Sequence, residues 1–134
     1  ILQDGSDVTL VGCGLMVEVA MKAAEELKEE GINAAVINAY CIKPLAENVI
    51  LEYAKKTKAM VTVEDHSVIG GLGAAVAQVT SAKCPAVVRT VGVQDRFGES
   101  GLQDDLFEKY GLTAQHIVEE AKKAIAIKEG KANV

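Results

Sequence analysis

The sequence contains no tryptophan, and aromatic residues make up only 4% of its 134 positions. The core must therefore be built mainly from Val, Ile, Leu and Ala. Apolar residues still reach 49% and charged residues 25%, which is typical of a folded globular protein. This length and this aliphatic composition favour one domain over residues 1–134, with helices packed on a buried sheet. Since the chain begins with Ile rather than Met, we expect a fragment or processed product with another domain ahead of it.

Cysteine and histidine are scarce as well. Cys13, Cys41 and Cys84 lie far apart with no C-x-x-C, which indicates reduced thiols in an intracellular, cytoplasmic protein. Zinc is disfavoured because neither His66 nor His116 has a cysteine at ligand spacing. No apolar run reaches the length of a membrane span, and the net charge of −5 argues against nucleic acid as the partner.

Short apolar runs alternate with stretches in which apolar residues recur at helical spacing. Gly31 and Gly130 are typical of helix ends, and Thr113 is typical of a helix N-cap. The expected strands are residues 7–14, 32–40, 58–64 and 85–93, and the expected helices are 16–27, 44–53, 70–81, 102–111 and 113–130. This order predicts an α/β fold with a mostly parallel, buried sheet that has helices on both faces.

The turn after the first expected strand, "GCGLMV", lies where dinucleotide-binding folds carry G-x-G-x-x-G. Val17 replaces the third glycine, and Asn38 or Tyr40 stands where a ribose-binding carboxylate is needed. The chain also has no G-K-[ST] phosphate loop. We therefore interpret these glycines as allowing a tight turn.

A second polar motif, "EDHSVIGGLG", follows the third expected strand, at the edge where open α/β sheets place ligands. Its candidate residues are Glu64, Asp65, His66, Gly70, Gly71 and Gly73. The acidic residues and the histidine could act in acid–base chemistry, although Ser67 is not in a nucleophile-elbow motif. The glycine-rich helix start could bind an anion. The interpretation that we favour is a structural or interface element, in which glycines permit close backbone approach.

Two arginines remain to be explained. Arg96, in the loop "QDRFGESG", could bind a carboxylate or phosphate, or could pair within the chain. Arg89 interrupts an apolar strand, so it needs a charged partner or a route to solvent. We interpret Cys13 and Cys84 as small apolar core residues.

Four stretches of the chain resemble the C-terminal domain of transketolase nearly end to end: "DVTLVGCGLMVEVAMKAAEELKEEGINAAVINAYCIKPL", "MVTVEDHSVIGGLGAAVAQ", "DRFGESG" and "YGLTAQHIVEEAKKAI". The related domains of deoxyxylulose-phosphate synthase and of the pyruvate dehydrogenase β subunit share this architecture. The resemblance implies a three-layer α/β/α domain with a mostly parallel, five-stranded mixed sheet. Its antiparallel fifth strand would come from residues Ile1 to Gln3.

The resemblance also implies a function that is carried outside this chain. Transketolases transfer a two-carbon ketol unit between sugar phosphates with thiamine diphosphate and Mg²⁺ or Ca²⁺. In that family the N-terminal domain holds the diphosphate and metal, and the middle domain supplies the cofactor-activating glutamate. Glu64 belongs to a different motif, so we expect no catalytic, cofactor-binding or metal-binding residue here.

The resemblance therefore predicts a C-terminal association domain that is inactive alone. Its expected partners are the N-terminal and middle domains, within a homodimer that Glu64 and His66 help to align. One alternative is the same domain of deoxyxylulose-phosphate synthase or of a 2-oxo-acid dehydrogenase β subunit. Another is a stand-alone anion-binding regulatory module. An enzyme acting alone through Asp65 and His66 is disfavoured.

Overall fold

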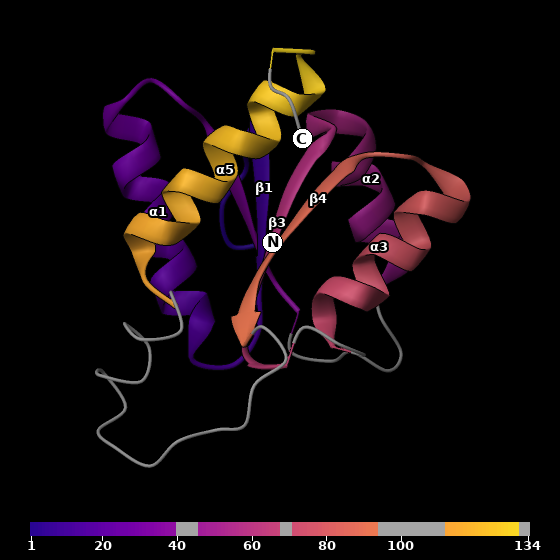
Figure 1. The fold of residues 1–134 in the computed structure, drawn as a ribbon, viewed down its shortest axis with the longest axis horizontal. Helices are drawn as coiled ribbons and strands as arrows, with labels where there is room; N and C mark the ends of the chain where they lie inside the picture. Colours follow the sequence, from indigo (N-terminus) through magenta and orange to yellow (C-terminus); the bar gives the residue numbers. More distant parts are fainter. Residues whose placement is uncertain (40–45, 68–70, 94–111, 132–134) are drawn as a thin grey trace.

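The computed structural model describes residues 1–39, 46–67, 71–93 and 112–131. Strands and helices alternate along these residues, as the sequence predicts (Figure 1). The elements are β1 (Val8–Gly12), α1 (Met16–Glu29), β2 (Ala34–Asn38), α2 (Glu47–Thr57), β3 (Ala59–Ser67), α3 (Leu72–Lys83), β4 (Val87–Val93) and α5 (Ala114–Lys128). The helix expected at 102–111 and the helix start expected at Pro44 lie outside the described residues.

The described residues form a sheet of four parallel strands in the order β2-β1-β3-β4. The predicted α/β class and parallel sheet are therefore confirmed. The count of five strands is wrong for the described residues, because Gln3 makes only an isolated antiparallel bridge to Val36. Gly5 then passes so close to β2 that a Cβ atom there would lie 2.3 Å from the carbonyl carbon of Ala34.

Helices cover both faces of the sheet, as predicted. Helices α1 and α5 pack on one face, and α2 and α3 pack on the other (Figure 1). Alternate strand residues therefore belong to two aliphatic cores, so that Leu10 and Val61 face α1 and α5 while Val11 and Met60 face the other pair. Burial on both faces explains why the strands read as continuous apolar runs.

Local signals account for several helix ends. Gly31, with a φ of +78°, follows α1 in the left-handed conformation that glycine adopts without strain. The amide of Ile32 then donates to the Leu27 carbonyl at 3.0 Å, which closes the helix end. At the start of α5, the Thr113 hydroxyl accepts a hydrogen bond from the His116 amide at 3.2 Å, which confirms the predicted N-cap.

Candidate functional site: the corner between β3 and α3

The carboxyl end of β3 and the start of α3 bring the motif singled out in the sequence to one edge of the sheet. The sequence predicted a strand that ends at Glu64, but β3 continues to Ser67. Its pairing with β4 shifts register between Val63 and Ser67, so the strand carries an irregularity there. Asp65 and the backbone of His66 are therefore strand residues rather than loop residues.

Glu64 is fully buried and binds the first turn of α3. Its Oε1 accepts a hydrogen bond from the Leu72 amide and its Oε2 accepts one from the Gly73 amide, both at 2.9 Å. Gly71, the N-cap residue of α3, has no side chain that could do this. A carboxylate at a helix N-terminus is favoured by the helix dipole, and its hydrogen bonds are charge-assisted. Glu64 therefore occupies two amides that an external anion would need.

Gly73 is required by the close approach of α3 to the sheet. A Cβ atom at this position would lie 2.5 Å from Cγ2 of Thr90 and 2.8 Å from Oγ1 of Thr62. The Thr62 hydroxyl is buried and has no hydrogen-bond partner among the residues that the structure describes. Gly71 has extended backbone angles that other residues also adopt. A packing contact thus accounts for one glycine of the motif.

The other predicted site residues are placed only in part. The side chain of Asp65 is half-buried and takes part in an interaction within the molecule. The His66 side chain, Gly70 and Arg96 lie outside what the structure describes. An interface role for this motif and an anion contact by Arg96 therefore stay predictions.

Cys13 lies near this corner, at the carboxyl end of β1. Its side chain packs in the core on the α2 and α3 face and is 7% exposed. Burial raises the pKa of the Cys13 thiol, and the negative charges of Glu64 and Asp65 raise it further. The thiol is thus held in its weakly nucleophilic, protonated form, in keeping with its interpretation as a small core residue.

Arg89 has a partner that local sequence patterns did not reveal. Its Nε donates to Oε2 of Glu120 on α5 at 2.7 Å, and Glu120 also accepts from Lys123 at 3.1 Å. Burial acts to raise the pKa of the Glu120 carboxyl, but the hydrogen bonds from Arg89 and Lys123 outweigh it and hold the pKa below its usual value. An acidic residue on the otherwise apolar face of α5 was the available signal.

The described residues contain no group of three or more His, Cys, Asp or Glu side chains placed to hold a metal ion. A search of the same residues for a helix long and apolar enough to cross a membrane also found none.

The fold and the corner together define a three-layer α/β/α domain, with a strand glutamate that caps the next helix. The family model for the transketolase C-terminal domain matches residues 1–117. The chain therefore belongs to the transketolase C-terminal domain family.

Relatives and a solved structure agree with this assignment. The chain is 51% identical over 121 residues to the 6-deoxy-6-sulfo-D-fructose transketolase subunit SqwH of Clostridium sp. (strain MSTE9), covering 90% of this chain and 38% of that protein. It is 38% identical over 135 residues to 1-deoxy-D-xylulose-5-phosphate synthase of Heliobacterium modesticaldum, covering 100% of this chain and 21% of the synthase. A solved split-gene transketolase, described as an inactive beta4 tetramer, matches with a TM-score of 0.92 and 48% identity, over 96% of this chain and 42% of that one. The chain thus spans less than half the length of each of these three proteins.

Proposed function

We propose that this chain is the association domain of a thiamine-dependent transketolase, and that parts of the enzyme outside it carry out ketol transfer between sugar phosphates. The family assignment supports this proposal, as do relatives named as a transketolase subunit and a split-gene transketolase. The observation that carries it is the role of Glu64. Glu64 was a candidate for acid–base chemistry, but its carboxylate is buried and accepts hydrogen bonds from two amides of α3.

The described residues do not fit thiamine diphosphate. A diphosphate needs unpaired amides or cations, and the Leu72 and Gly73 amides at the start of α3 are already bound to Glu64. The negative charge of Glu64 would also repel a diphosphate at this position. We therefore assign the cofactor and its Mg²⁺ or Ca²⁺ to the N-terminal and middle domains or subunit, and derive no step of the reaction from this chain.

The corner between β3 and α3 has an indirect part in this proposal. Because the Glu64 side chain is 0% exposed, it acts by fixing the start of α3 rather than by touching a partner. Other residues of the motif, including His66, would then form the surface that meets the neighbouring domain or the second subunit of a homodimer. A bulky residue in place of Gly71 in the whole enzyme should weaken dimerisation or cofactor retention, and analytical ultracentrifugation would measure the former.

The direct test uses the 134-residue chain alone and mixed with the polypeptide that carries the preceding domains of the same enzyme. We expect no ketol transfer and no calorimetric binding of thiamine diphosphate by the chain alone. We expect turnover of a ketose phosphate and an aldose phosphate once both polypeptides are present with the cofactor and Mg²⁺. Binding of thiamine diphosphate by the chain alone, or turnover by it, would overturn the proposal.

A second candidate is deoxyxylulose-phosphate synthase, because relatives with that name are 38% and 43% identical to this chain. The substrate requirement of the same reconstituted mixture distinguishes the synthase from transketolase. Turnover that requires a 2-oxo-acid donor and releases carbon dioxide would favour the synthase, whereas turnover with a ketose phosphate donor favours transketolase. A cytoplasmic location is part of the proposal for either enzyme.

A further inference from the structure

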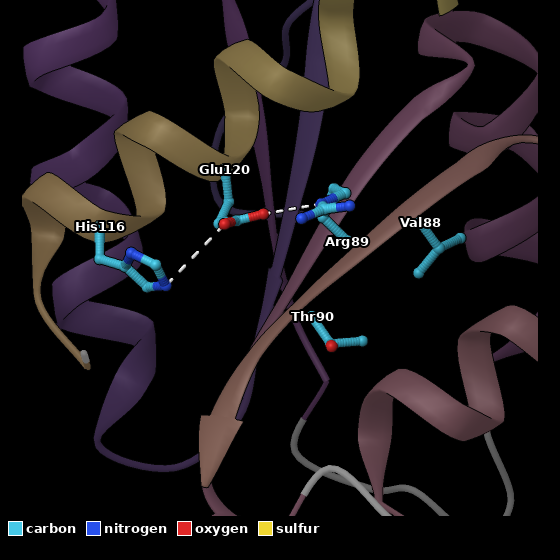
Figure 2. Close-up of a pocket in the computed structure, with 5 residues that line it drawn as sticks. All are labelled: Val88, Arg89, Thr90, His116 and Glu120. Atoms are coloured by element: carbon cyan, nitrogen blue, oxygen red, sulfur yellow. Dashed lines mark hydrogen bonds and ion pairs between the residues drawn. The ribbon is translucent and has the colours of Figure 1, made fainter. Parts of the chain in front are cut away.

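A polar pocket of about 350 Å³ lies beside β4, on the side of the molecule formed by β4 and the start of α5. It is lined by Val88, Arg89 and Thr90 of the strand and by His116 and Glu120 of the helix. Figure 2 shows the Arg89 side chain on the α5 side of β4 and those of Val88 and Thr90 on its α3 side. Neither the family assignment nor the proposed function gives this pocket a role. The predicted contact Arg96 lies outside the described residues.

Arg89 offers hydrogen-bond donors to this pocket. Its side chain is 33% exposed, whereas that of its partner Glu120 is only 7% exposed. The bond to Glu120 engages Nε and so fixes the plane of the guanidinium. Among the described residues this is the only hydrogen bond of the Arg89 side chain, which leaves both terminal amino groups to donate to a ligand. A guanidinium held in this way matches the two oxygens of a carboxylate or phosphate.

The backbone of β4 adds further donors. The Val87 amide donates to the Lys58 carbonyl at 3.1 Å, on the side of the strand that faces β3. Because amides alternate along a strand, those of Val88 and Thr90 point to the opposite, outer side. The outer edge of a sheet can form a concave anion site from such amides.

The charges around the pocket are balanced, and this limits what it can bind. Glu120 is shared by Arg89 and Lys123, at 2.7 and 3.1 Å, so its charge is already offset by two cations. His116 lies 4.0 Å from Glu120 and 3.6 Å from Glu119 on the same helix. The two carboxylates and the two cations, Arg89 and Lys123, sum to zero charge. The pocket therefore suits one small oxyanion held mainly by hydrogen bonds, and a highly charged ligand would gain little there.

We propose that this pocket binds a small oxyanion, a carboxylate or a phosphate, between the Arg89 guanidinium and the outward amides of β4. Arg89 anchors the ligand through its terminal amino groups. Glu120 is a positioning residue that orients Arg89. The imidazole of His116 borders the ligand from α5, where the Thr113 cap fixes its backbone. The inference rests on β4 and α5 alone and does not depend on the proposed function.

Nuclear magnetic resonance of the full 134-residue chain tests this site. Sodium phosphate and sodium acetate are titrated separately over the millimolar range, with sodium chloride keeping the ionic strength constant. We expect saturable shifts at the Val88 and Thr90 amides, the Arg89 Nε–H group and the His116 ring. Saturation by one anion but not the other identifies the ligand class. Shifts that rise without saturation, or that spread over the surface lysines, would overturn the proposal.

Variants then test the anchor. Arg89→Gln alone leaves Glu120 without its partner, so the main variant is Arg89→Gln with Glu120→Gln, which keeps a neutral side-chain pair. We expect it to weaken anion binding by roughly tenfold or more, because the charge-assisted hydrogen bonds are lost. Arg89→Lys should weaken binding less. The control Lys56→Gln removes a cation that pairs with Asp4 elsewhere and should leave binding unchanged. Equal binding by the double variant and the native chain would refute the role of Arg89.

Discussion

Removing the Glu64 carboxylate should destabilise the domain far more than removing an exposed carboxylate. In Glu64→Ala, the Leu72 and Gly73 amides lose acceptors that now lie at 2.9 Å in a fully buried position. An unsatisfied buried donor costs about 1–3 kcal/mol, so two such donors predict a loss of roughly 2–6 kcal/mol. Glu64→Gln keeps one acceptor but turns an amino group toward the second amide, so we expect a loss of about 2–3 kcal/mol.

Urea unfolding followed by far-ultraviolet circular dichroism measures both losses, which suits a chain without tryptophan. The matched control is Glu47→Gln, which removes a carboxylate from an exposed ion pair with Lys83 and should cost no more than about 0.5 kcal/mol. Hydrogen exchange should also show faster exchange at the Leu72 and Gly73 amides in the Glu64 variants. If Glu64→Ala costs no more than the control, the carboxylate does not cap α3 and the reasoning fails.

Three further predictions address packing, charge and reactivity. Gly73→Ala should lower the free energy of unfolding by about 1–3 kcal/mol through overpacking, as urea unfolding would measure. Adding Thr90→Ser, which removes the nearest methyl group, should restore part of this loss. A Gly73→Ala variant as stable as the native chain would contradict the close approach of α3 to the sheet. The pKa of Glu120 in the folded chain is lowered from 4.5, so ionised Glu120 stabilises the fold above pH 4.5, and this stabilisation is lost as the pH falls through the folded-state pKa. The free energy of unfolding should therefore fall less steeply with acid in Glu120→Gln, and an unchanged pH profile would contradict this prediction. Cys13 should react with iodoacetamide more slowly than the half-exposed Cys84, because its thiol is buried and its pKa is raised. Peptide mass spectrometry would measure both rates, and equal rates would mean that the Cys13 thiol is accessible.

The order of elements could be predicted because its signals are local. Apolar runs mark the strands, and recurring Ala and Leu residues mark the buried faces of the helices. The end of β3 could not be predicted in this way. Glu64 and Asp65 are typical of a loop, yet the strand continues because a carboxylate there binds α3 amides eight and nine residues further along the chain.

Long-range partners account for the remaining differences. Arg89 could be recognised as needing a partner, but Glu120 lies 31 residues away on another element. The contact that requires Gly73 involves threonines on two strands, and no single segment of sequence records it. The antiparallel direction of the segment around Gln3 was expected from the resemblance, whereas no local signal in the sequence shows that it makes only one isolated bridge.

The close approach of Gly5 to β2 and the bridge from Gln3 to Val36 place the first residues of the chain beside β2. The chain enters the domain at the β2 edge of the sheet, and β4 forms the opposite edge. Three strand spacings of about 4.8 Å place these edges roughly 14 Å apart. A fusion partner or fluorescent label joined ahead of Ile1 would thus start on the side away from the β4 pocket.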